Sequence, residues 1–342
     1  MAGSLQGRNK TGIMRKRIAI FFGGPSSEYE VSLESAKSIL ENIDKKKYEP
    51  YLFKIRKDLK SAFYKAGNQI IPPKGVIFKE FTKTLKENKN KFGVALVAAL
   101  HGEFGEDGTI QSQLENLNIK YTGSNSKSSA LCIDKYLSMK KVAGINDLYL
   151  PKTLRLDIDK IKNNKLLPFP LILKPNFLGS SVLVFVIDSK KDFNKAISEL
   201  KKGKVKDLLI QEYINGIEIS CGCLQDKKHR FTNLPPIEIR PKSTFFDYSS
   251  KYEIGGSEEI TPPVSVSKKT SDLISKLAVE IHKKLNCSTY SRSDFIYKDG
   301  KIYYLETNTL PGMTKTSLLP QEVQAAGITV TNLLDFIIRE SL

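Results

Sequence analysis

Short apolar runs alternate with amphipathic stretches along this chain, and the alternation is typical of an α/β protein. Buried strands are expected at 17–22, 48–55 and 93–100. A helix should begin after the first of them, because Ser27 and Glu30 have the spacing of a capping box. Strands that alternate with helices form parallel sheets, which bind ligands at the carboxyl ends of their strands.

The rest of the chain predicts further groups of elements. The lysine-rich stretch 57–91 is interpreted as peripheral loop and helix, and 128–145 as one amphipathic helix. Residues 240–263 should form a long irregular loop, too long for a simple connection in a compact domain. The remaining expected elements are strands at 169–175, 181–187, 208–214, 216–224 and 230–239, and helices at about 190–202 and 268–286.

A β-hairpin with a polar face is expected near the C-terminal end. Asp294 and Glu306 are equidistant from Gly300, so a three-residue loop would place them opposite each other. Asn308 would project from the same face, beside Arg292. Two carboxylates and an amide are hard oxygen ligands that suit Mg²⁺. The alternative is an ordinary surface hairpin whose polar residues face solvent.

Composition limits the class of protein. Apolar residues make up 40% and charged residues 27% of the 342 residues, as in soluble globular proteins, and the length predicts two or three domains. The longest apolar run, 93–100, is too short for a membrane span. No secretory signal is visible, so a cytoplasmic location is expected. Residues 1–16 are interpreted as a flexible tail or an expression remnant.

The formal net charge of +17 raises the possibility of nucleic-acid binding. The lysines, however, are spread over most segments, and the sequence has no Arg-rich arm, no RNP-like aromatic motif and no Cys/His finger. A basic surface that attracts ATP and other anions is the preferred interpretation.

Four cysteines are present, at Cys132, Cys221, Cys223 and Cys287. The Cys-Gly-Cys spacing is tighter than that of usual zinc knuckles. Buried free thiols in a reducing compartment are therefore favoured over a metal site.

Three further stretches can contact a nucleotide or a small substrate. Lys174 lies at a strand end before a loop with Ser180 and Ser181, whose backbone amides can hold phosphate oxygens, although this is not a Walker A motif. The strand before Glu218 can offer its backbone to an adenine edge and the carboxylate to a ribose. His101 follows a buried strand in a glycine-rich stretch that permits close approach of a ligand. Each stretch alone is also compatible with a purely structural role.

The order of these motifs resembles the ATP-grasp fold, and within it the D-alanine–D-alanine ligases, from about residue 17 to 340. The resemblance implies a Rossmann-like, open α/β substrate domain (17–127), followed by central (128–216) and C-terminal (217–342) ATP-grasp subdomains. In the last of these, 240–263 would close as a lid. The matching stretches are FFGGPSSEYEVSL (21–33), LHGEFGEDGTIQ (100–111), YTGS (121–124), DK (134–135), LKPNFLGSSV (173–182), FFDYSSKY (245–252), YSRSDF (290–295) and LETNTLPGMTKTSL (305–318).

The resemblance also implies an activity and residue roles. The activity is ATP-dependent ligation of two D-alanine molecules for peptidoglycan synthesis, through an acyl phosphate, by an enzyme that is a homodimer. The implied ligands of two Mg²⁺ ions, for which Mn²⁺ can substitute, are Asp294, Glu306 and Asn308. Catalysis and substrate binding fall to Glu28, His101, Ser180, Tyr252, Arg292, Gly312 and Ser317. ATP binding falls to Lys135, Lys174, Ser180, Ser181, Gln211, Glu212, Tyr213, Ile214, Glu218 and Lys251.

Several positions depart from the family's pattern without removing a proposed ligand. Leu183, Thr289 and Ser112 stand where glycine is common, Leu178 replaces a polar residue and Phe246 a tyrosine. Three alternatives stay open: a ligase that makes D-alanyl-D-lactate or D-alanyl-D-serine, an ATP-grasp relative that binds without catalysis, and a nucleic-acid binder.

Overall fold

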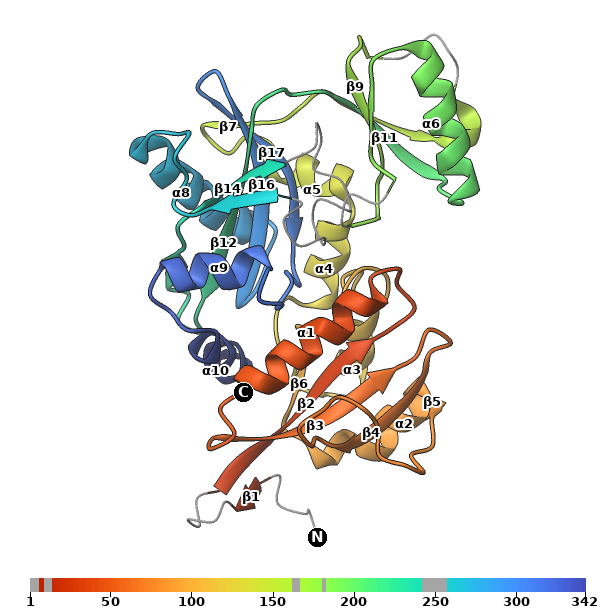
Figure 1. Ribbon diagram of the computed structural model, residues 1–342, viewed down its shortest axis with the longest axis vertical. Coiled ribbons are helices and arrows are strands. Elements are labelled where there is room, and N and C mark those ends of the chain that lie inside the picture. Colours follow the sequence, from red (N-terminus) through yellow and green to blue (C-terminus); the bar gives the residue numbers. More distant parts are fainter. Residues whose placement is uncertain (1–5, 9–13, 162–166, 180–182, 242–256) are drawn as a thin grey trace.

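The structure is a computed structural model that describes residues 6–8, 14–161, 167–179, 183–241 and 257–342. In these ranges the α-helices are α1 Tyr29–Asn42, α2 Phe81–Asn88, α3 Thr109–Asn116, α4 Ser126–Ile133, α5 Lys135–Val142, α6 Lys190–Lys202, α8 Lys268–Lys284, α9 Leu318–Ala325 and α10 Val330–Ser341. The strands are β1 Gln6–Arg8, β2 Met14–Gly23, β3 Tyr48–Ile55, β4 Lys60–Lys65, β5 Lys79–Glu80, β6 Val94–Leu96, β7 Leu148–Tyr149, β8 Thr153–Asp157, β9 Leu171–Pro175, β10 Phe185–Ile187, β11 Asp207–Glu212, β12 Ile217–Gln225, β13 Phe231–Asn233, β14 Ile237–Pro241, β15 Ser257–Ile260, β16 Tyr290–Lys298 and β17 Lys301–Asn308. Figure 1 shows them arranged in an N-terminal, a central and a C-terminal lobe.

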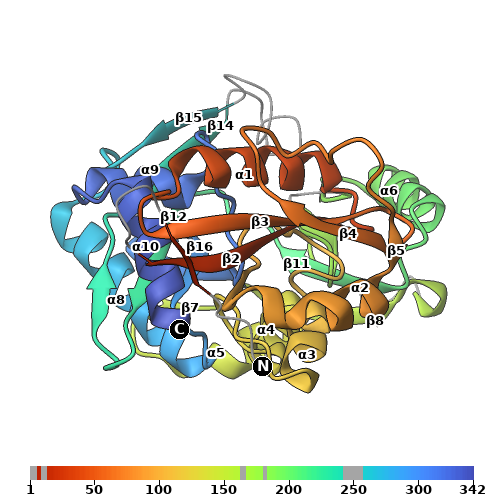
Figure 2. The same cartoon turned by 90° about the horizontal axis from the view of Figure 1, so that it is seen from below.

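The N-terminal lobe contains a mixed sheet rather than the expected parallel one. β2 pairs in parallel with β3 and β6, whereas β1, β4 and β5 run antiparallel to their neighbours. The interpretation of 57–91 as loop and helix is confirmed for the helix, α2, and wrong for the part that forms β4 and β5. The apolar alternation in β4 is short and flanked by lysines, so the sequence pattern does not reveal it. α1 covers one face of the sheet, and α2 and α3 cover the other (Figure 2).

The predicted capping box at the start of α1 is wrong. The helix begins at Tyr29, and the preceding Glu28 makes no side-chain capping hydrogen bond. The Glu28 backbone N–H donates instead to Ser26 Oγ at 3.1 Å. The Glu28 carboxylate therefore does not satisfy the helix backbone and can serve the site described below.

The strand predicted over 93–100 is shorter than expected. β6 ends at Leu96, because the Val97 N–H donates to Thr122 Oγ1 at 3.1 Å rather than to a neighbouring strand. The residues up to Leu100 remain buried, so their apolar character reflects burial without strand pairing.

The predicted single helix over 128–145 is two helices. α4 and α5 meet at Asp134, whose backbone is extended, with φ −76° and ψ 92°. The Asp134 carboxylate accepts a hydrogen bond from the Leu137 N–H at 2.9 Å and so caps α5. Lys135 thereby becomes the first residue of a new helix at a bend in the chain.

The central lobe contains an antiparallel sheet, and the sheet of the C-terminal lobe is antiparallel except for the parallel pair β17–β7. The central sheet has the order β10-β9-β11-β8, and α6 packs against β10. The C-terminal sheet has the order β15-β14-β12-β16-β17-β7, with β13 also pairing with β12, and α8 packs against it. β15 lies within 240–263, so the described part of that stretch is not wholly irregular, contrary to expectation.

Three groups of buried apolar side chains form the cores of the described chain, and they do not follow the chain order strictly. α4 and α5 share a core with the C-terminal sheet through Cys132 and Met139. α9 and α10 share the N-terminal core, in which Ile337 lies together with Ile18. The domain limits drawn from the sequence stay a prediction. All four cysteines are buried and unbridged, as predicted.

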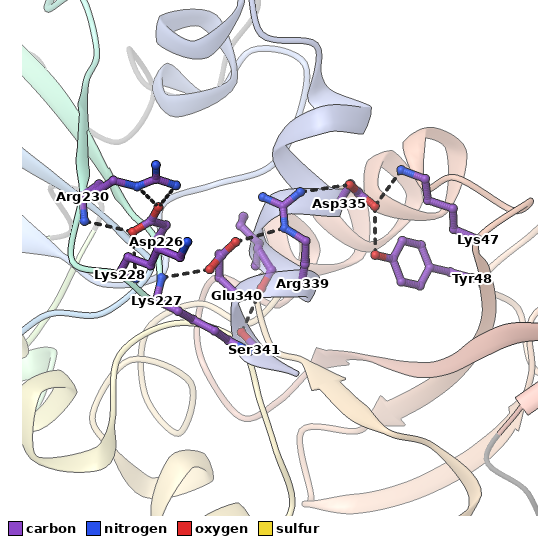
Figure 3. A network of polar contacts seen from close by, with 11 residues as sticks. Lys47, Tyr48, Asp226, Lys227, Lys228, Arg230, Asp335, Arg339, Glu340 and Ser341 are labelled. Carbon is purple, nitrogen blue, oxygen red and sulfur yellow. Dashed lines mark hydrogen bonds and ion pairs between the residues drawn. The ribbon is translucent and has the colours of Figure 1, made fainter.

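Polar contacts join α10 to two neighbouring parts of the chain (Figure 3). Asp335 accepts a hydrogen bond from the Tyr48 hydroxyl at 2.9 Å and forms an ion pair with Lys47 at 3.1 Å. On the other side, Glu340 accepts from the Lys227 backbone N–H at 2.9 Å. These contacts, with the shared apolar core, hold the N-terminal lobe against the C-terminal sheet. Within the described ranges, none of the helices has the length and apolar character that a membrane crossing needs.

Candidate active site

Two adjoining cavities lie between the lobes and share part of their lining. The first, here called the substrate cavity, is lined by Glu28 and His101 from the N-terminal lobe and by residues of β16 and β17. The second, here called the nucleotide cavity, lies between the central and the C-terminal sheets. The residues that line both cavities are Lys135, Glu218, Asp294 and Glu306. A group transferred from one cavity to the other would therefore pass these side chains.

The β16–β17 hairpin brings the predicted metal ligands to one face. Asp294 pairs with Glu306, and Arg292 pairs with Asn308, as expected. The predicted loop length is wrong, because Lys298 pairs with Lys301 across a two-residue turn. With this turn alone, Asp294 would pair with Leu305. A β-bulge next to Asp294 shifts the register by one residue, so that Glu306 pairs with Asp294 and faces the cavity. The shared face thus depends on an irregularity in the strand.

Arg292 and Asp294 form a tight pair at the base of the substrate cavity. The Arg292 Nε donates to Asp294 Oδ1 at 3.0 Å and Nη2 donates to Oδ2 at 2.9 Å, while Ser220 Oγ donates to Oδ1 at 2.6 Å. Burial lowers the pKa of Arg292, but the Asp294 carboxylate outweighs it, and the pKa of the guanidinium is raised above its ordinary value. Arg292 therefore holds a permanent positive charge at a largely enclosed position of the cavity wall.

Lys135 joins the bend between α4 and α5 to both cavities. Its ammonium donates to the Leu178 carbonyl at 2.7 Å and lies 3.2 Å from Glu306 Oε2. The side chain is buried, so its charge depends on these oxygen partners. Its position beside a candidate metal ligand suits a phosphate contact.

The N-terminal wall of the substrate cavity is a buried acid–imidazole cluster. His101 Nε2 lies 2.9 Å from Ser35 Oγ, and Nδ1 lies 3.8 Å from Glu106 Oε1. Burial, together with the nearby Glu28 charge, raises the pKa of Glu106. Glu106 was not among the predicted site residues, although its glycine-rich surroundings in the HGEFGEDG stretch gave a signal.

Glu28 faces the loop that follows β9. A side-chain carbon on Gly179 would lie 3.3 Å from Glu28 Oε2, and one on Gly102 would lie 2.9 Å from the same oxygen. Both glycines thus let the backbone approach the carboxylate closely. The structure places Glu28, His101 and the end of the β9 loop around one space, and their roles there stay predictions.

The nucleotide cavity is lined by the predicted lysine and strand residues. Lys174 is buried on β9, and the lining continues with Gln211 and Glu212 at the end of β11 and with Tyr213 and Ile214 just after it. Gln211 Nε2 donates to Thr153 Oγ1 at 2.9 Å, which fixes the orientation of its amide. Glu212 Oε2 accepts from the Lys152 N–H at 3.1 Å, so its carboxylate turns back to its own lobe.

Gly312 and Ser317 lie together on the far wall of the substrate cavity. A side-chain carbon on Gly312 would lie 2.5 Å from Ser317 Oγ, so a larger residue there would displace the Ser317 hydroxyl. Ser317 Oγ accepts from the Thr314 N–H at 3.1 Å, and Ser317 immediately precedes α9. Four predicted site residues, Ser180, Ser181, Lys251 and Tyr252, and most of the proposed lid lie outside the described residues, and their roles stay predictions.

A further acid, Glu322 of α9, lies beneath Arg292 and was not predicted. It is fully buried, and Oε2 accepts from the Gly222 N–H at 2.7 Å, whereas Oε1 has no hydrogen-bond partner among the described residues. Gly222 is the strand neighbour of Arg292. Burial raises the pKa of Glu322 to about 8, against the opposing effect of Arg292. No sequence signal separates this glutamate from the exposed polar residues of a helix.

The substitution Glu322→Gln should make stability less dependent on pH. The folded-state pKa of about 8 lies above the ordinary 4.5, so folding retains a proton between these values. The stabilisation is complete below the lower pKa and is lost as the pH rises through the upper one. Between about pH 5 and 9 the wild type should lose on the order of 4 kcal/mol more than the variant. The measurement is the thermal midpoint against pH without Mg²⁺ or nucleotide.

A matched control is Glu280→Gln, which removes an exposed carboxylate paired with Lys283. This variant should follow the wild-type pH curve, since exposed pairs contribute little. Parallel curves for the wild type and Glu322→Gln over the same pH range would contradict a protonated Glu322.

Two facing, mainly antiparallel sheets that hold a lysine-lined cavity next to a carboxylate–arginine site define an enzyme of the ATP-grasp class. Solved structures agree: the chain is similar to the D-alanine–D-alanine ligase of Bacillus anthracis complexed with ATP (TM-score 0.75, 32% identity, 95% of this chain and 97% of that chain). It is also similar to the VanG D-Ala:D-Ser ligase of Enterococcus faecalis (TM-score 0.78, 30% identity, 96% of this chain and 100% of that chain). The predicted fold class is confirmed.

The chain belongs to the D-alanine–D-alanine ligase family. The family models described as D-ala D-ala ligase N-terminus and C-terminus match residues 17–124 and 152–339. The chain is 39% identical to the D-alanine–D-alanine ligase of Clostridium beijerinckii, over 95% of this chain and 98% of the relative. The predicted family and its ligase activity are thereby confirmed.

Proposed function

We propose that this enzyme joins two D-alanine molecules to form D-alanyl-D-alanine, with conversion of ATP to ADP and phosphate, for peptidoglycan precursors. The observation that carries the proposal is the shared lining of the two cavities. Lys135, Asp294 and Glu306 border both the space suited to a nucleotide and the space suited to an amino acid. Phosphoryl transfer from ATP to a substrate carboxylate needs such a meeting point.

The first D-alanine is bound by the N-terminal wall of the substrate cavity. The Glu28 carboxylate pairs with its ammonium group, and His101, held by Ser35, approaches its carboxylate. Tyr252 and Ser180 support Glu28 from the lid and the β9 loop. This places the substrate carboxylate towards Asp294 and Glu306.

ATP occupies the nucleotide cavity. Its adenine lies against Gln211 to Ile214, its ribose against Glu218, and its phosphates against Lys135 and Lys174. Ser181 and Lys251 complete the phosphate contacts from the β9 loop and the lid.

The oxygen donors of the hairpin fit Mg²⁺. Asp294, Glu306 and Asn308 line one cavity from neighbouring strands, and this set of hard oxygen ligands suits the ion. Two Mg²⁺ ions, or Mn²⁺ in their place, would supply charge neutralisation to the ATP phosphates when bound.

The second half of the reaction uses the opposite wall. The acyl phosphate is sensitive to water, so closure of the lid at 240–263 protects it. The amine of the second D-alanine, whose carboxylate is bound by Ser317, attacks the acyl carbon and phosphate leaves. The oxyanion that forms is stabilised by Arg292 and by the Gly312 N–H.

The proposal also includes the location, the oligomeric state and the domains of the enzyme. The enzyme acts in the cytoplasm, as a homodimer, with the N-terminal substrate domain at 17–127 and the two ATP-grasp subdomains at 128–216 and 217–342. No nucleic acid and no membrane take part. The net charge of +17 serves to attract anionic ATP.

Phosphate release from Mg-ATP, with products identified by mass, tests the reaction. Release should require D-alanine and give D-alanyl-D-alanine, while L-alanine gives none. Mixtures of D-alanine with D-lactate or D-serine test the sister activities, which the proposal expects to be minor. A folded enzyme that releases no D-alanine-dependent phosphate, or that forms mainly the D-lactate or D-serine product, would overturn the proposal.

A further inference from the structure

The nucleotide cavity has walls from two bodies whose cores are largely separate, with Leu209 of β11 as the central-sheet residue that lies in the C-terminal core. Lys174, Gln211 and Leu178 belong to the central sheet and its loop, whereas Ile296 and Leu305 belong to the C-terminal sheet. The bend between α4 and α5 belongs with the C-terminal sheet, because its neighbours Cys132 and Met139 share that core. The width of the cavity therefore depends on whatever fixes one body against the other.

A polar cluster crosses from one body to the other next to this cavity. Arg155 of β8 binds Asp207 of β11 through two nitrogens, with Nη2–Oδ2 at 2.6 Å and Nε–Oδ1 at 3.1 Å. Its third nitrogen, Nη1, reaches Asp134 Oδ2 at 3.2 Å in the other body. Asp134 is buried. The hydrogen bond to Asp207 makes the largest contribution to raising the pKa of Arg155. A single guanidinium thus connects both bodies.

Asn176, which follows β9, makes a second crossing. It is fully buried, and Nδ2 donates to Asp134 Oδ1 at 3.0 Å and to Asp207 Oδ2 at 3.2 Å. Its Oδ1 accepts from the Tyr136 N–H at 3.0 Å, and its carbonyl accepts from the Lys135 N–H at 3.3 Å. The first turn of α5, which carries Lys135, is therefore tied directly to the central body.

Two aromatic rings enclose the arginine. The Arg155 guanidinium carbon lies 5.8 Å from the centre of the Tyr136 ring and 5.7 Å from that of Phe177. Cation–π contacts of this kind hold a planar guanidinium in one orientation. One ring comes from each body, so the stacking also spans the joint.

We propose that Arg155 and Asp134 are positioning residues that set the width of the nucleotide cavity and the place of Lys135 within it. Neither residue lines either cavity, so they act on ATP through Lys135 and the β9 loop. The proposal rests on the nucleotide site proposed above. It predicts that loss of the pair weakens ATP binding and leaves D-alanine binding nearly unchanged, because the substrate cavity is lined almost entirely by the other two lobes.

A double-mutant cycle tests this. The variants are Arg155→Met, which keeps the length and packing of the side chain, Asp134→Asn, which can still cap α5, and the double variant. Each single substitution should raise the KM for ATP about tenfold, and the double variant no more than either alone, since both remove the same interaction. The KM for D-alanine should change less than about twofold. Arg155→Lys should recover part of the loss and keeps the test available if Asp134→Asn does not fold.

Two further variants separate the possible failures. Arg230→Met removes an arginine–aspartate pair within one turn, Arg230–Asp226 at 2.6 Å, and should leave both KM values unchanged. Lys174→Met should raise the KM for ATP; if it does not, the nucleotide site itself is wrong. Suppose that Lys174→Met raises the KM for ATP as expected. The positioning role alone is then overturned if the Arg155 and Asp134 variants have no effect, have additive effects, or raise both KM values equally.

Discussion

Replacement of Arg292 by methionine should lower kcat by about 10²–10³-fold, the usual effect of losing one oxyanion donor. The guanidinium is largely enclosed, permanently charged and held by both oxygens of Asp294. It therefore needs no rearrangement when negative charge develops on the acyl oxygen. Since this charge appears only in the transition state, the KM values for both substrates should change much less than kcat. Steady-state kinetics at saturating ATP and D-alanine provide the measurement.

The control separates oxyanion stabilisation from support of Asp294. Arg292→Lys keeps a positive charge but cannot bind both Asp294 oxygens, so its kcat should lie between those of the wild type and Arg292→Met. The Mg²⁺ concentration for half-maximal activity should stay within a few-fold of wild type in both variants. A kcat within tenfold of wild type for Arg292→Met would rule out the oxyanion role. A large shift in Mg²⁺ dependence would instead assign Arg292 to the support of a metal ligand.

The β16–β17 hairpin shows which part of a strand pairing can be predicted from equal spacing about a turn in the sequence. Equal spacing about Gly300 predicted that Asp294 faces Glu306, and the pairing is confirmed. The predicted three-residue loop is wrong: Asp299 and Gly300 form a two-residue turn, with φ of 47° and 78° at the two positions. A tight turn alone would place Leu305 opposite Asp294, and only the bulge restores the pairing. Bulges depend on local packing and leave no regular pattern in sequence.

Features that depend on distant contacts were missed for a different reason. Asp134 interrupts an amphipathic pattern that otherwise continues, because its carboxylate is engaged by Arg155 and Asn176 from another lobe. Glu106 and Glu322 are acids in helical or glycine-rich contexts, and nothing local shows that they are buried. Periodicity reports which face of an element is apolar, not which polar side chain meets a partner far along the chain.

At two positions where the family commonly has glycine, this chain has another residue in the backbone conformation that glycine favours. Leu183 and Thr289 adopt φ of 58° and 66°, the left-handed region in which glycine is comfortable. The backbone therefore keeps the shape that glycine favours, at a cost on the order of 1–2 kcal/mol for each side chain. The sequence could identify these substitutions, but the retained backbone shape follows only from the structure.

The substitution Glu306→Gln should raise the Mg²⁺ concentration for half-maximal activity at least about tenfold and lower kcat about 10²-fold even at saturating Mg²⁺. Glu306, like Asp294, lines both cavities, and it lies 3.2 Å from Lys135, so it offers a negative oxygen where the phosphates must be neutralised. Glutamine keeps the size and one oxygen but removes the charge. The measurement is the rate against Mg²⁺ concentration, with a fixed excess of ATP.

The comparison with Asp294 makes the Glu306 prediction sharper. Asp294 is already engaged by Arg292 and Ser220, whereas Glu306 forms an ion pair with Lys135, a proposed phosphate ligand. Binding of Mg-ATP should therefore rearrange Glu306 and Lys135 together, and Lys135→Met combined with Glu306→Gln should be less than additive in its effect on kcat. Glu280→Gln, on the exposed face of α8, should leave the Mg²⁺ curve unchanged. Near-normal turnover of Glu306→Gln at saturating Mg²⁺ would show that this carboxylate does not hold the ion, and the hairpin would then bind substrate through Arg292 alone.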